Sequence, residues 1–401
     1  MTGSVEFAYV VGTCDTKGEE LRYVRDLLHR AGVPALLVDV GTRSMDSGAD
    51  IGPGEIAAFH PEGAATILEE RDRGKAVMAM SEALRRFVCA RTDIGGMIGL
   101  GGSGGAAIIA PALRALAVGT PKILVTTAAS RNVRPYVGAS DICMLYPVTD
   151  ILGLNSILVQ VLANAAHALA GMMQRRPAAV PADKIAVGFT MFGVTTTAVS
   201  QVVAALRDDY DCLVFHAIGI GGQSMEALVD AGRIRAVIDL TTTEICDLFM
   251  GGVQPADPDR LGAIARTRVP YVGSCGALDM VNFGAMDTVP AHYRERRLHA
   301  HNAHVTLMRT TADENERMGE WIGAKLNACE GPVRFLLPLG GVSAIDIAGG
   351  PFHFPEADEA LFAALRRSVR LTPDRQLIEL PFHINDPAFA AAVVNQFRAI
   401  C

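Results

Sequence analysis

The stretch GGMIGLGGSGGAAIIAPALRAL, residues 95–116, decides the fold class, because a short apolar run passes through clustered glycines into a helical pattern. The same order occurs at AYVVG (8–12), which is followed by an amphipathic segment that ends at Gly32. ALLVDV (35–40) and PKILVTT (121–127) are further buried-strand patterns. Parallel strands need a crossover connection, which helices provide, so this alternation predicts an α/β fold with a parallel sheet.

A second copy of the pattern follows QRRPAAVPADK (174–184), whose prolines and charges are typical of an interdomain linker. In our alignment of the two halves, residues 184–206 parallel 7–28, residues 212–232 parallel 95–115, and residues 269–279 parallel 121–130. We therefore predict two Rossmann-like parallel-sheet domains in tandem, facing a central cleft, with an N-terminal domain at 1–176, a linker at 177–184 and a C-terminal domain at 185–401. Residues 61–90 look helical and highly charged, and we place them as a lid or flank outside the sheet.

The composition is that of a globular protein, since half of the 401 residues are hydrophobic and a fifth are charged. The net charge of -7 gives no support for binding nucleic-acid phosphates. Eight scattered cysteines without a CxxC pair argue against a disulfide framework or a zinc knuckle and fit a reducing compartment. The start has no signal-peptide pattern, and no 18-residue stretch lacks both charges and turn residues. We expect a cytoplasmic protein with no nucleic-acid or membrane partner.

The glycine turn GLGGSGG (99–105) matches GxGxxG between a strand and a helix. Glycines let the backbone approach a phosphate, and a helix start presents unpaired amides with the positive end of the dipole. The acidic residue that NAD binding needs about 20 positions later is missing, and so is a Walker A motif. The alternative is a tight packing turn without a ligand. The candidate anion contacts are Gly99, Gly101, Gly102, Ser103 and Gly104.

Two further turns follow strands of the same half. In Gly12-Thr13-Cys14-Asp15-Thr16-Lys17, Lys17 is a candidate phosphate counter-ion and Asp15 or Thr16 a candidate Mg²⁺ ligand, with Gly12 and Thr13 beside the nucleotide. The alternative is that Thr16 only caps the helix, since Thr16 and Glu19 fit a capping box. In the segment 126–132, Thr127, Ser130 and Arg131 are candidate phosphate contacts, and ordinary loop capping is the alternative.

The second half offers weaker candidates. Thr241-Thr242-Thr243-Glu244 follows the apolar strand AVIDL, and Gly219, Gly221 and Gly222 repeat the glycine-turn logic as a second anion site. His301 lies in HxHxxH (299–304), where no single regular element aims all three histidines at one metal, so a polar or general-base role competes with zinc. Asp279, in GALDMVNFG, needs a partner if it is buried. Asp279, His301 and Glu244 are the candidate catalytic residues.

These motifs carry a resemblance to a known family. GTCDTKGEEL, GLGGSGGAA, TMFGVTTTAV, LVFHAIGIGGQSMEALV, DLTTTEICD, GALDMVNFG and PFHINDPAFA occur in the order of the ATP-binding family typified by the tomato mosaic virus replication inhibitor of plants. The resemblance covers essentially the whole chain. It implies two Rossmann-like subdomains, ATP with Mg²⁺ as ligand, and a homodimer or higher homo-oligomer. It does not imply antiviral action, which depends on protein–protein contacts outside these motifs.

Two functions compete at this point. The first is a nucleotide-binding protein that holds ATP and Mg²⁺ in the turns of the N-terminal domain. The second is an enzyme that acts on a small phosphorylated or carboxylated metabolite held between the domains. This second hypothesis is based on the polar residues at strand ends in the second half.

Overall fold

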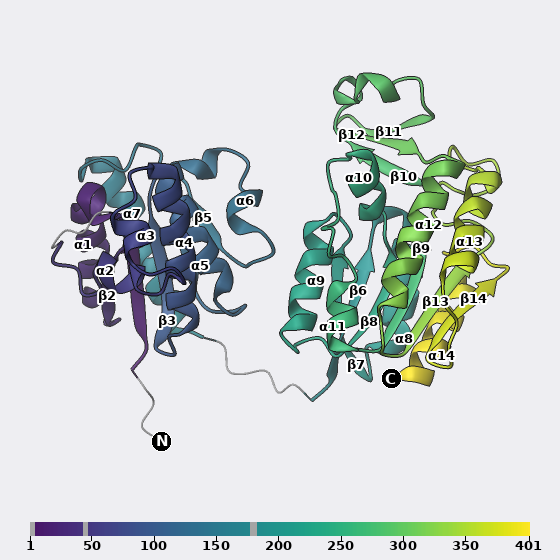
Figure 1. The fold of residues 1–401 in the computed structure, drawn as a ribbon, viewed down its shortest axis with the longest axis horizontal. Coiled ribbons are helices and arrows are strands. Elements are labelled where there is room, and N and C mark those ends of the chain that lie inside the picture. Colours follow the sequence, from purple (N-terminus) through teal and green to yellow (C-terminus); the bar gives the residue numbers. More distant parts are fainter. Residues whose placement is uncertain (1–4, 43–46, 177–182) are drawn as a thin grey trace. The chain divides into compact units, whose positions relative to one another are not determined.

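The computed structural model describes residues 5–42, 47–176 and 183–401. The chain divides into two units, residues 1–180 and 181–401 (Figure 1). Of the expected linker at 177–184, residues 177–182 lie outside the described part of the chain.

The N-terminal unit has a five-stranded, all-parallel sheet of order β2-β1-β3-β4-β5. Its strands are β1 (Phe7–Gly12), β2 (Ala35–Asp39), β3 (Ile94–Leu100), β4 (Lys122–Val125) and β5 (Cys143–Leu145). The central strands are apolar at every position except Lys122 of β4 and are almost wholly buried, as a sheet covered on both faces requires. The α/β expectation is confirmed.

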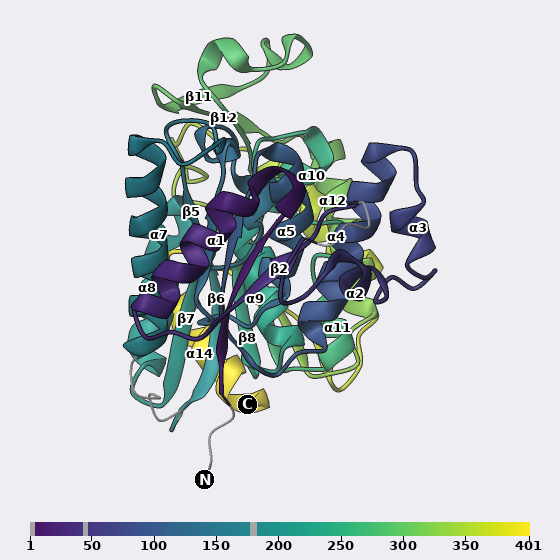
Figure 2. The same ribbon diagram turned by 90° about the vertical axis from the view of Figure 1, so that its left-hand side faces the viewer.

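Helices cover both faces of this sheet (Figure 2). The helices α1 (Cys14–Arg30) and α7 (Ser156–Gln174) pack on one face, and α4 (Arg73–Cys89) and α5 (Ser103–Ala115) pack on the other. Shorter helical elements are α2 (Pro53–Ala57), α3 (Ala65–Leu68), η1 (Thr127–Ser130) and α6 (Arg134–Val137). The expectation that 61–90 is helical and lies outside the sheet is confirmed for α4, which flanks one face. The lid alternative is wrong, because α4 buries Met80, Leu84 and Phe87 in the core beside α5.

The C-terminal unit has a six-stranded parallel sheet of order β14-β13-β9-β8-β6-β7. Its strands are β6 (Ile185–Met191), β7 (Tyr210–His216), β8 (Ala236–Thr241), β9 (Tyr271–Gly276), β13 (Val333–Pro338) and β14 (Arg375–Leu380). One face is covered by α8 (Thr196–Leu206), which follows η2 (Gly193–Thr195), and by α14 (Pro387–Ile400). The other face is covered by α9 (Ile220–Asp230), α10 (Glu244–Met250), α11 (Gly262–Thr267), α12 (Ala312–Asn327) and α13 (Pro355–Ser368).

A small antiparallel sheet of order β10-β12-β11 is added beyond α10 at the top of this unit in Figure 1. Its strands are β10 (Met280–Phe283), β11 (Leu298–Asn302) and β12 (Val305–Arg309), and the short turns η3 (Met286–Thr288) and η4 (Ala291–Tyr293) connect β10 to β11. This sheet is inserted after β9, so it lies over the end of the parallel sheet where ligands of α/β proteins usually bind.

The two sheets share one strand order, which confirms the repeat but corrects our alignment. In both units the first strand is central, the second lies on one side of it, and the third and fourth follow on the other side. The segment 212–232 contains β7 and α9 and is therefore the counterpart of β2, not of the glycine turn 99–105. The true counterpart of β3 and its turn is β8 with Thr241–Glu244.

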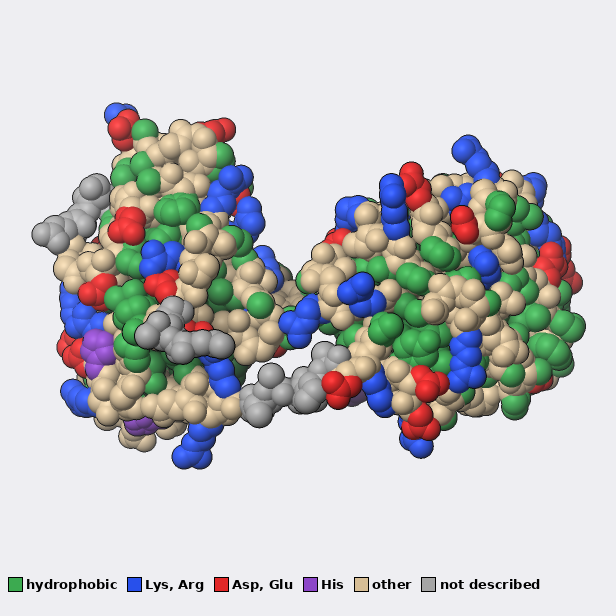
Figure 3. Space-filling model, turned by 90° about the horizontal axis from the view of Figure 1, so that it is seen from below, with side chains coloured by type: hydrophobic (Ala, Val, Ile, Leu, Met, Phe, Trp, Pro, Cys, Tyr) green, Lys and Arg blue, Asp and Glu red, His purple; other side chains and the backbone are tan. Residues whose placement is uncertain are grey.

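The helix α7 differs from the expectation that no stretch of the sequence could span a membrane. The helix α7 has the length and hydropathy of a membrane span. In the fold, Leu158, Leu162 and Leu169 of α7 pack instead against the sheet and α1. On the face drawn in Figure 3, basic and acidic side chains are interspersed.

Candidate functional site

The strand order brings the three predicted turns of the N-terminal domain to one edge of the sheet. The order 2-1-3-4-5 is that of flavodoxin-like folds, whose ligands bind outside the carboxyl ends of the strands, where the first and third strands diverge. The turns 12–17, 99–105 and 126–131 follow β1, β3 and β4, which are neighbours in the sheet. All thirteen residues predicted to contact the nucleotide therefore lie at or next to this edge.

The glycines of the turn 99–105 fall into two groups. A Cβ on Gly99 would lie 2.5 Å from Cγ2 of Ile109, and one on Gly101 would lie 2.9 Å from Cα of Gly105, so tight packing requires glycine at both positions. A Cβ on Gly102 would meet nothing nearer than Oγ1 of Thr127 at 3.9 Å, and one on Gly104 would meet nothing within 4 Å. The packing explanation thus accounts for Gly99 and Gly101 and leaves Gly102 and Gly104 beside open space.

The amino end of α5 lies at this open part of the turn. Gly102 is the N-cap residue and has no side chain to cap the first amides of the helix, and Ser103 is exposed. The first amides of a helix have no intrahelical acceptor, and together with the dipole they favour a negative charge. The arrangement can therefore take up an anion such as a phosphate.

The turn after β1 differs from our expectation. The helix begins at Cys14 with Thr13 as its N-cap, so the predicted capping box of Thr16 with Glu19 is wrong. The hydroxyls of Thr13 and Thr16 are 2.9 Å apart, and the amide of Cys14 donates to Oδ1 of the buried Asp39 at 3.0 Å. An internal carboxylate thus takes one of the amides of this helix start.

Lys17 and Asp15 are the ionisable residues of this turn. Lys17 has φ -132° and ψ 16°, which are not helical values, and it marks a kink in the first turns of α1. Its side chain is half-buried, and within the described ranges it has no hydrogen bond or ion pair, while Asp15 is exposed. Because the turn after β1 and the start of α5 lie at the same edge of the sheet, the ammonium of Lys17 is able to pair with an anion bound there.

The turn after β4 is held by its own hydroxyls. Oγ1 of Thr126 accepts from the amide of Ala128 at 3.1 Å, and Oγ of Ser130 donates to the carbonyl of Thr127 at 2.9 Å. Arg131 is exposed, and no hydrogen bond or ion pair holds its guanidinium in the part of the chain described. Loop capping therefore occupies the hydroxyls of Thr126 and Ser130, whereas Oγ1 of Thr127 lies 3.9 Å from the position of a Cβ on Gly102.

The predicted second anion site in the C-terminal domain is closed. Oε2 of Glu244 accepts from the amide of Gly219 at 2.7 Å, which is the contact that an anion would make. A Cβ on Gly222 would lie 2.1 Å from Oε1 of Glu244, and one on Gly221 would lie 1.8 Å from the carbonyl oxygen of His216. The glycines of this turn are needed for packing around Glu244, so the expectation of a ligand there is wrong.

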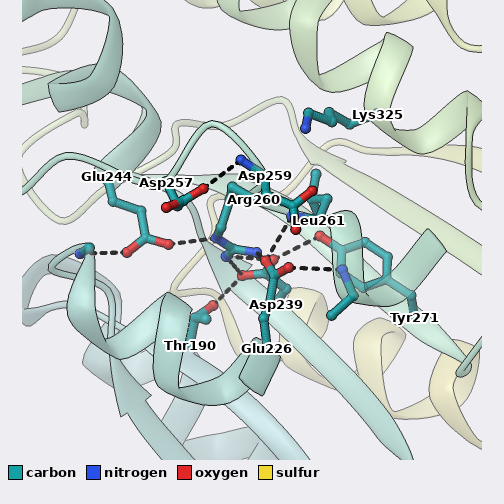
Figure 4. A network of polar contacts seen from close by, with 12 residues as sticks. Thr190, Glu226, Asp239, Glu244, Asp257, Asp259, Arg260, Leu261, Tyr271 and Lys325 are labelled. Carbon is teal, nitrogen blue, oxygen red and sulfur yellow. Dashed lines mark hydrogen bonds and ion pairs between the residues drawn. The ribbon is translucent and has the colours of Figure 1, made fainter. Parts of the chain in front are cut away.

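Glu244 belongs to a buried ion network centred on Arg260 (Figure 4). Arg260 is 2% exposed, and its guanidinium contacts Glu244 at 2.5 Å, Asp239 at 2.8 Å and Glu226 at 3.0 Å. Tyr271 and Thr190 donate further hydrogen bonds to Asp239. Burial raises the pKa of Glu244, and Arg260 opposes that rise. Glu244 is therefore a structural group here and not a free catalytic acid.

The other two catalytic candidates lie apart from this network. Asp279 is wholly buried and accepts a hydrogen bond from Oγ of Ser343 at 2.7 Å, and burial raises its pKa to about 7. His301 is exposed on β11, where a bulge interrupts the pairing with β12. No hydrogen bond or ion pair in the described structure joins any two of Asp279, His301 and Glu244, and no group of three or more His, Cys, Asp or Glu residues is arranged there to hold a metal.

Sequence reasoning missed Arg260 and the partners that close the second turn. The signal was Asp239, a charge inside the apolar strand AVIDL, because a buried charge requires a partner. Nothing in the sequence indicates that this partner is Arg260, which is 21 residues away. Asp39, which takes one amide of the α1 start, was missed for the same reason.

The sequence is similar to those of proteins from bacteria and plants. Models of the uncharacterised protein family UPF0261 match the chain twice, the N-terminal domain model at residues 6–178 and the C-terminal domain model at residues 184–401. A UPF0261 protein of Rhizobium meliloti is 55% identical over 392 residues, which cover 98% of each chain. One of Clostridium tetani is 43% identical over 393 residues, which cover 96% of this chain and 97% of that protein. The ToMV resistance protein Tm-1(GCR237) of Solanum lycopersicum is 40% identical over 417 residues, which cover 98% of this chain and 55% of the tomato protein.

Proposed function

The chain belongs to the UPF0261 family over both of its domains, and from this premise we propose that its N-terminal domain binds ATP, with Mg²⁺ held through the nucleotide, at the carboxyl ends of β1, β3 and β4. The observation that carries the proposal is the open amino end of α5 at Gly102–Gly104. The turns that hold Lys17 and Arg131 follow strands next to β3, and in the described part of the chain neither side chain has a hydrogen bond or ion pair. The corresponding positions of the C-terminal domain are filled by Thr241–Glu244, which are buried. The proposal therefore assigns one nucleotide to each chain.

The α5 amides are suited to the phosphates. Gly102 and Gly104 leave the space in which a phosphate would lie, and the 13-residue helix contributes its dipole. Lys17 and Arg131 would supply positive charge from the neighbouring strands, and Arg131 has the planar geometry for bidentate contact with a phosphate.

The residues present also fit Mg²⁺. Magnesium in nucleotide sites keeps several waters and takes one or two protein oxygens besides the phosphates, so it does not need a cluster of protein ligands. Asp15 is exposed and acidic, whereas the hydroxyl of Thr16 is already engaged with Thr13. We therefore assign the metal contact to Asp15 before Thr16. Bound Mg²⁺ would neutralise phosphate charge, and Lys17 would hold the phosphates in place.

The tomato relative sets a boundary on what the proposal includes. Its printed name describes resistance to ToMV, and this chain spans 55% of its length. Resistance is not part of the proposal. The proposal includes a cytoplasmic location, which is supported by the eight free cysteines, because a reducing compartment keeps thiols unpaired. The proposal also includes a homodimer, and sedimentation of the whole chain tests it.

A matched pair of glycine substitutions tests the proposal. Gly104→Ala places a methyl group in the open space where a phosphate would lie, and overpacking of about 1–3 kcal/mol corresponds to an affinity about five- to 150-fold weaker. Gly171→Ala is the control, because Gly171 lies in α7 and its Cβ also would meet nothing within 4 Å. Both changes are compatible with the fold, so only ATP binding should separate them.

Titration calorimetry with ATP and Mg²⁺ gives the readout. We expect one ATP per chain in the wild type and in Gly171→Ala, and weaker binding in Gly104→Ala. Lys17→Ala should also lose about tenfold or more, since a charge-assisted hydrogen bond contributes about 1.5–3 kcal/mol. Equal affinities in all four proteins would place the nucleotide elsewhere, and the absence of any binding isotherm would refute the proposal.

A further inference from the structure

Large hydrophobic side chains are exposed together in the loop that follows β5. Tyr146 is 45% exposed, Val148 is 61% exposed and Leu152 is 75% exposed. Pro147 and Ile151, which lie between them, are buried, and Ile151 packs in the core with α1 and α7. The loop is therefore anchored, and its apolar side chains are nevertheless open to solvent. Exposed apolar side chains that gather in one place mark a surface that binds a partner or a ligand.

The backbone of the same loop is strained at Val148. Its φ of 68° lies in the left-handed region, which β-branched residues rarely adopt. Strain of this kind persists only where the surrounding structure enforces it, and it is concentrated at ligand sites. The strain is a second reason to regard the loop as more than a connection between β5 and α7.

Two hydrogen bonds place this loop along the carboxyl edge of the N-terminal sheet. At its start, the carbonyl of Leu145 accepts from the amide of Thr126, which begins the turn after β4, at 3.0 Å. Near its end, the amide of Gly153 donates to Oε1 of the buried Glu20 at 2.7 Å. Glu20 lies in α1, three residues after Lys17. The loop thus runs from the turn after β4 to the helix after β1, along the edge at which we propose that the phosphates bind.

The spacing of the strands suits a nucleotide. The strand β3, whose turn leads into α5, is separated from β5 only by β4. The carboxyl ends of β3 and β5 therefore lie two strand spacings apart, which is about 10 Å. A nucleotide spans a separation of this size between its phosphates and its base. Sites for such ligands are lined mainly by apolar and aromatic side chains, and an aromatic ring stacks on the face of any base.

We propose that Tyr146, Val148 and Leu152 form the base-binding surface of the nucleotide site, with the ring of Tyr146 stacked against the base. This inference rests on the proposed nucleotide site at α5 and adds to it the residues that bind the nucleoside. The base is the occupant because the loop is hydrogen-bonded to both of the elements that flank the proposed phosphate site, the turn after β4 and α1. A second copy of the chain is the competing occupant.

Titration calorimetry of the full chain with two ligands tests this surface. The ligands are ATP with Mg²⁺ and tripolyphosphate with Mg²⁺, because tripolyphosphate carries the phosphates of ATP without the nucleoside. The variants are Tyr146→Ala and Leu152→Ser, which change exposed side chains and are compatible with the fold. Val118→Ser is the control, because Val118 is also exposed but lies in the loop before β4, at the opposite edge of the sheet.

We expect the wild type and Val118→Ser to bind ATP more tightly than tripolyphosphate. Tyr146→Ala should weaken ATP binding about five- to 150-fold, as the loss of one stacked base does, and leave tripolyphosphate binding unchanged. Leu152→Ser should weaken ATP binding in the same direction, and it decides the question if Tyr146→Ala does not fold.

The outcomes separate this inference from the proposed function. Tripolyphosphate binding as tight as ATP binding, or equal ATP affinity in Tyr146→Ala, Leu152→Ser and Val118→Ser, would overturn the base-binding surface and leave the phosphate site at α5. Absence of binding of both ligands to the wild type would refute the proposed function and this inference with it. Sedimentation of the same variants tests the competing occupant: a dimer that dissociates in Tyr146→Ala while ATP affinity stays unchanged would assign the surface to a second copy and overturn the proposal.

Discussion

Replacing Arg260 by methionine tests the claim that the second glycine turn is closed by an internal ion network. The guanidinium contacts three carboxylates within 3.0 Å, and among the described residues no other cation forms an ion pair with these three (Figure 4). Arg260→Met keeps a long apolar stem but leaves Asp239 and Glu244, both 0% exposed, without their counter-ion. The lost pairing and not the lost volume should therefore dominate the effect.

The expected magnitude follows from the burial. Removing one partner of a buried ion pair costs about 3–5 kcal/mol, because the remaining charges stay buried and uncompensated. That is a large fraction of the roughly 5–15 kcal/mol that stabilises a folded protein. With a urea dependence of about 2–3 kcal/mol per molar, the unfolding midpoint should fall by about 1–2.5 M.

Urea unfolding followed by the fluorescence of Trp321 measures this loss in the C-terminal domain. The control is Arg266→Met, because Arg266 pairs with Asp230 and Asp259 on the surface with its side chain 51% exposed. A surface ion pair contributes about 0–1 kcal/mol, so this control should unfold near the wild-type midpoint. If Arg260→Met costs no more than Arg266→Met, the network does not stabilise the turn and the reasoning is refuted.

Three further predictions concern the same fold. Gly222→Ala should destabilise the C-terminal domain by about 1–3 kcal/mol in the same urea assay, because its Cβ would lie 2.1 Å from Oε1 of Glu244; an unchanged midpoint would show that this turn is loose. A thiol reagent followed by mass spectrometry should label the exposed Cys89, Cys143 and Cys401 in the native chain and reach the buried Cys246 and Cys275 only after unfolding; the reverse order would contradict the packing. Thr311→Ala should cost about 1 kcal/mol in thermal unfolding, because Thr311 and Glu314 form a capping box at the start of α12; a smaller loss than from Thr288→Ala on the exposed η3 turn would count against the box.

The fold could be predicted from the sequence because its signal is local and repeated. Most central strands are largely apolar runs, many of which end in or lead directly into glycine or a hydroxyl residue, and most are followed by a helical pattern. The strand order, however, depends on pairing between distant segments. The turn GIGG after β7 looks like a phosphate turn in sequence, yet β7 lies at the edge of the sheet, and its turn faces the network around Arg260.

The sites were harder to predict because occupancy of a backbone amide depends on side chains from elsewhere. The turns at Gly102 and Gly219 have similar sequences, but Glu244 reaches the second turn from 25 residues away. The capping error at Thr16 has a local cause. Two threonines three residues apart offer two N-caps, and the carboxylate of Asp39 stabilises the earlier start by accepting from the amide of Cys14.

The most direct measurement is a crystal structure of the full chain soaked with ATP and Mg²⁺. The account predicts electron density for a triphosphate against the α5 amides at Ser103 and Gly104, with Lys17 in contact and nothing at Gly219. Triphosphate density at Gly219 or elsewhere in the C-terminal domain, or an empty α5 start at saturating ATP, would contradict it.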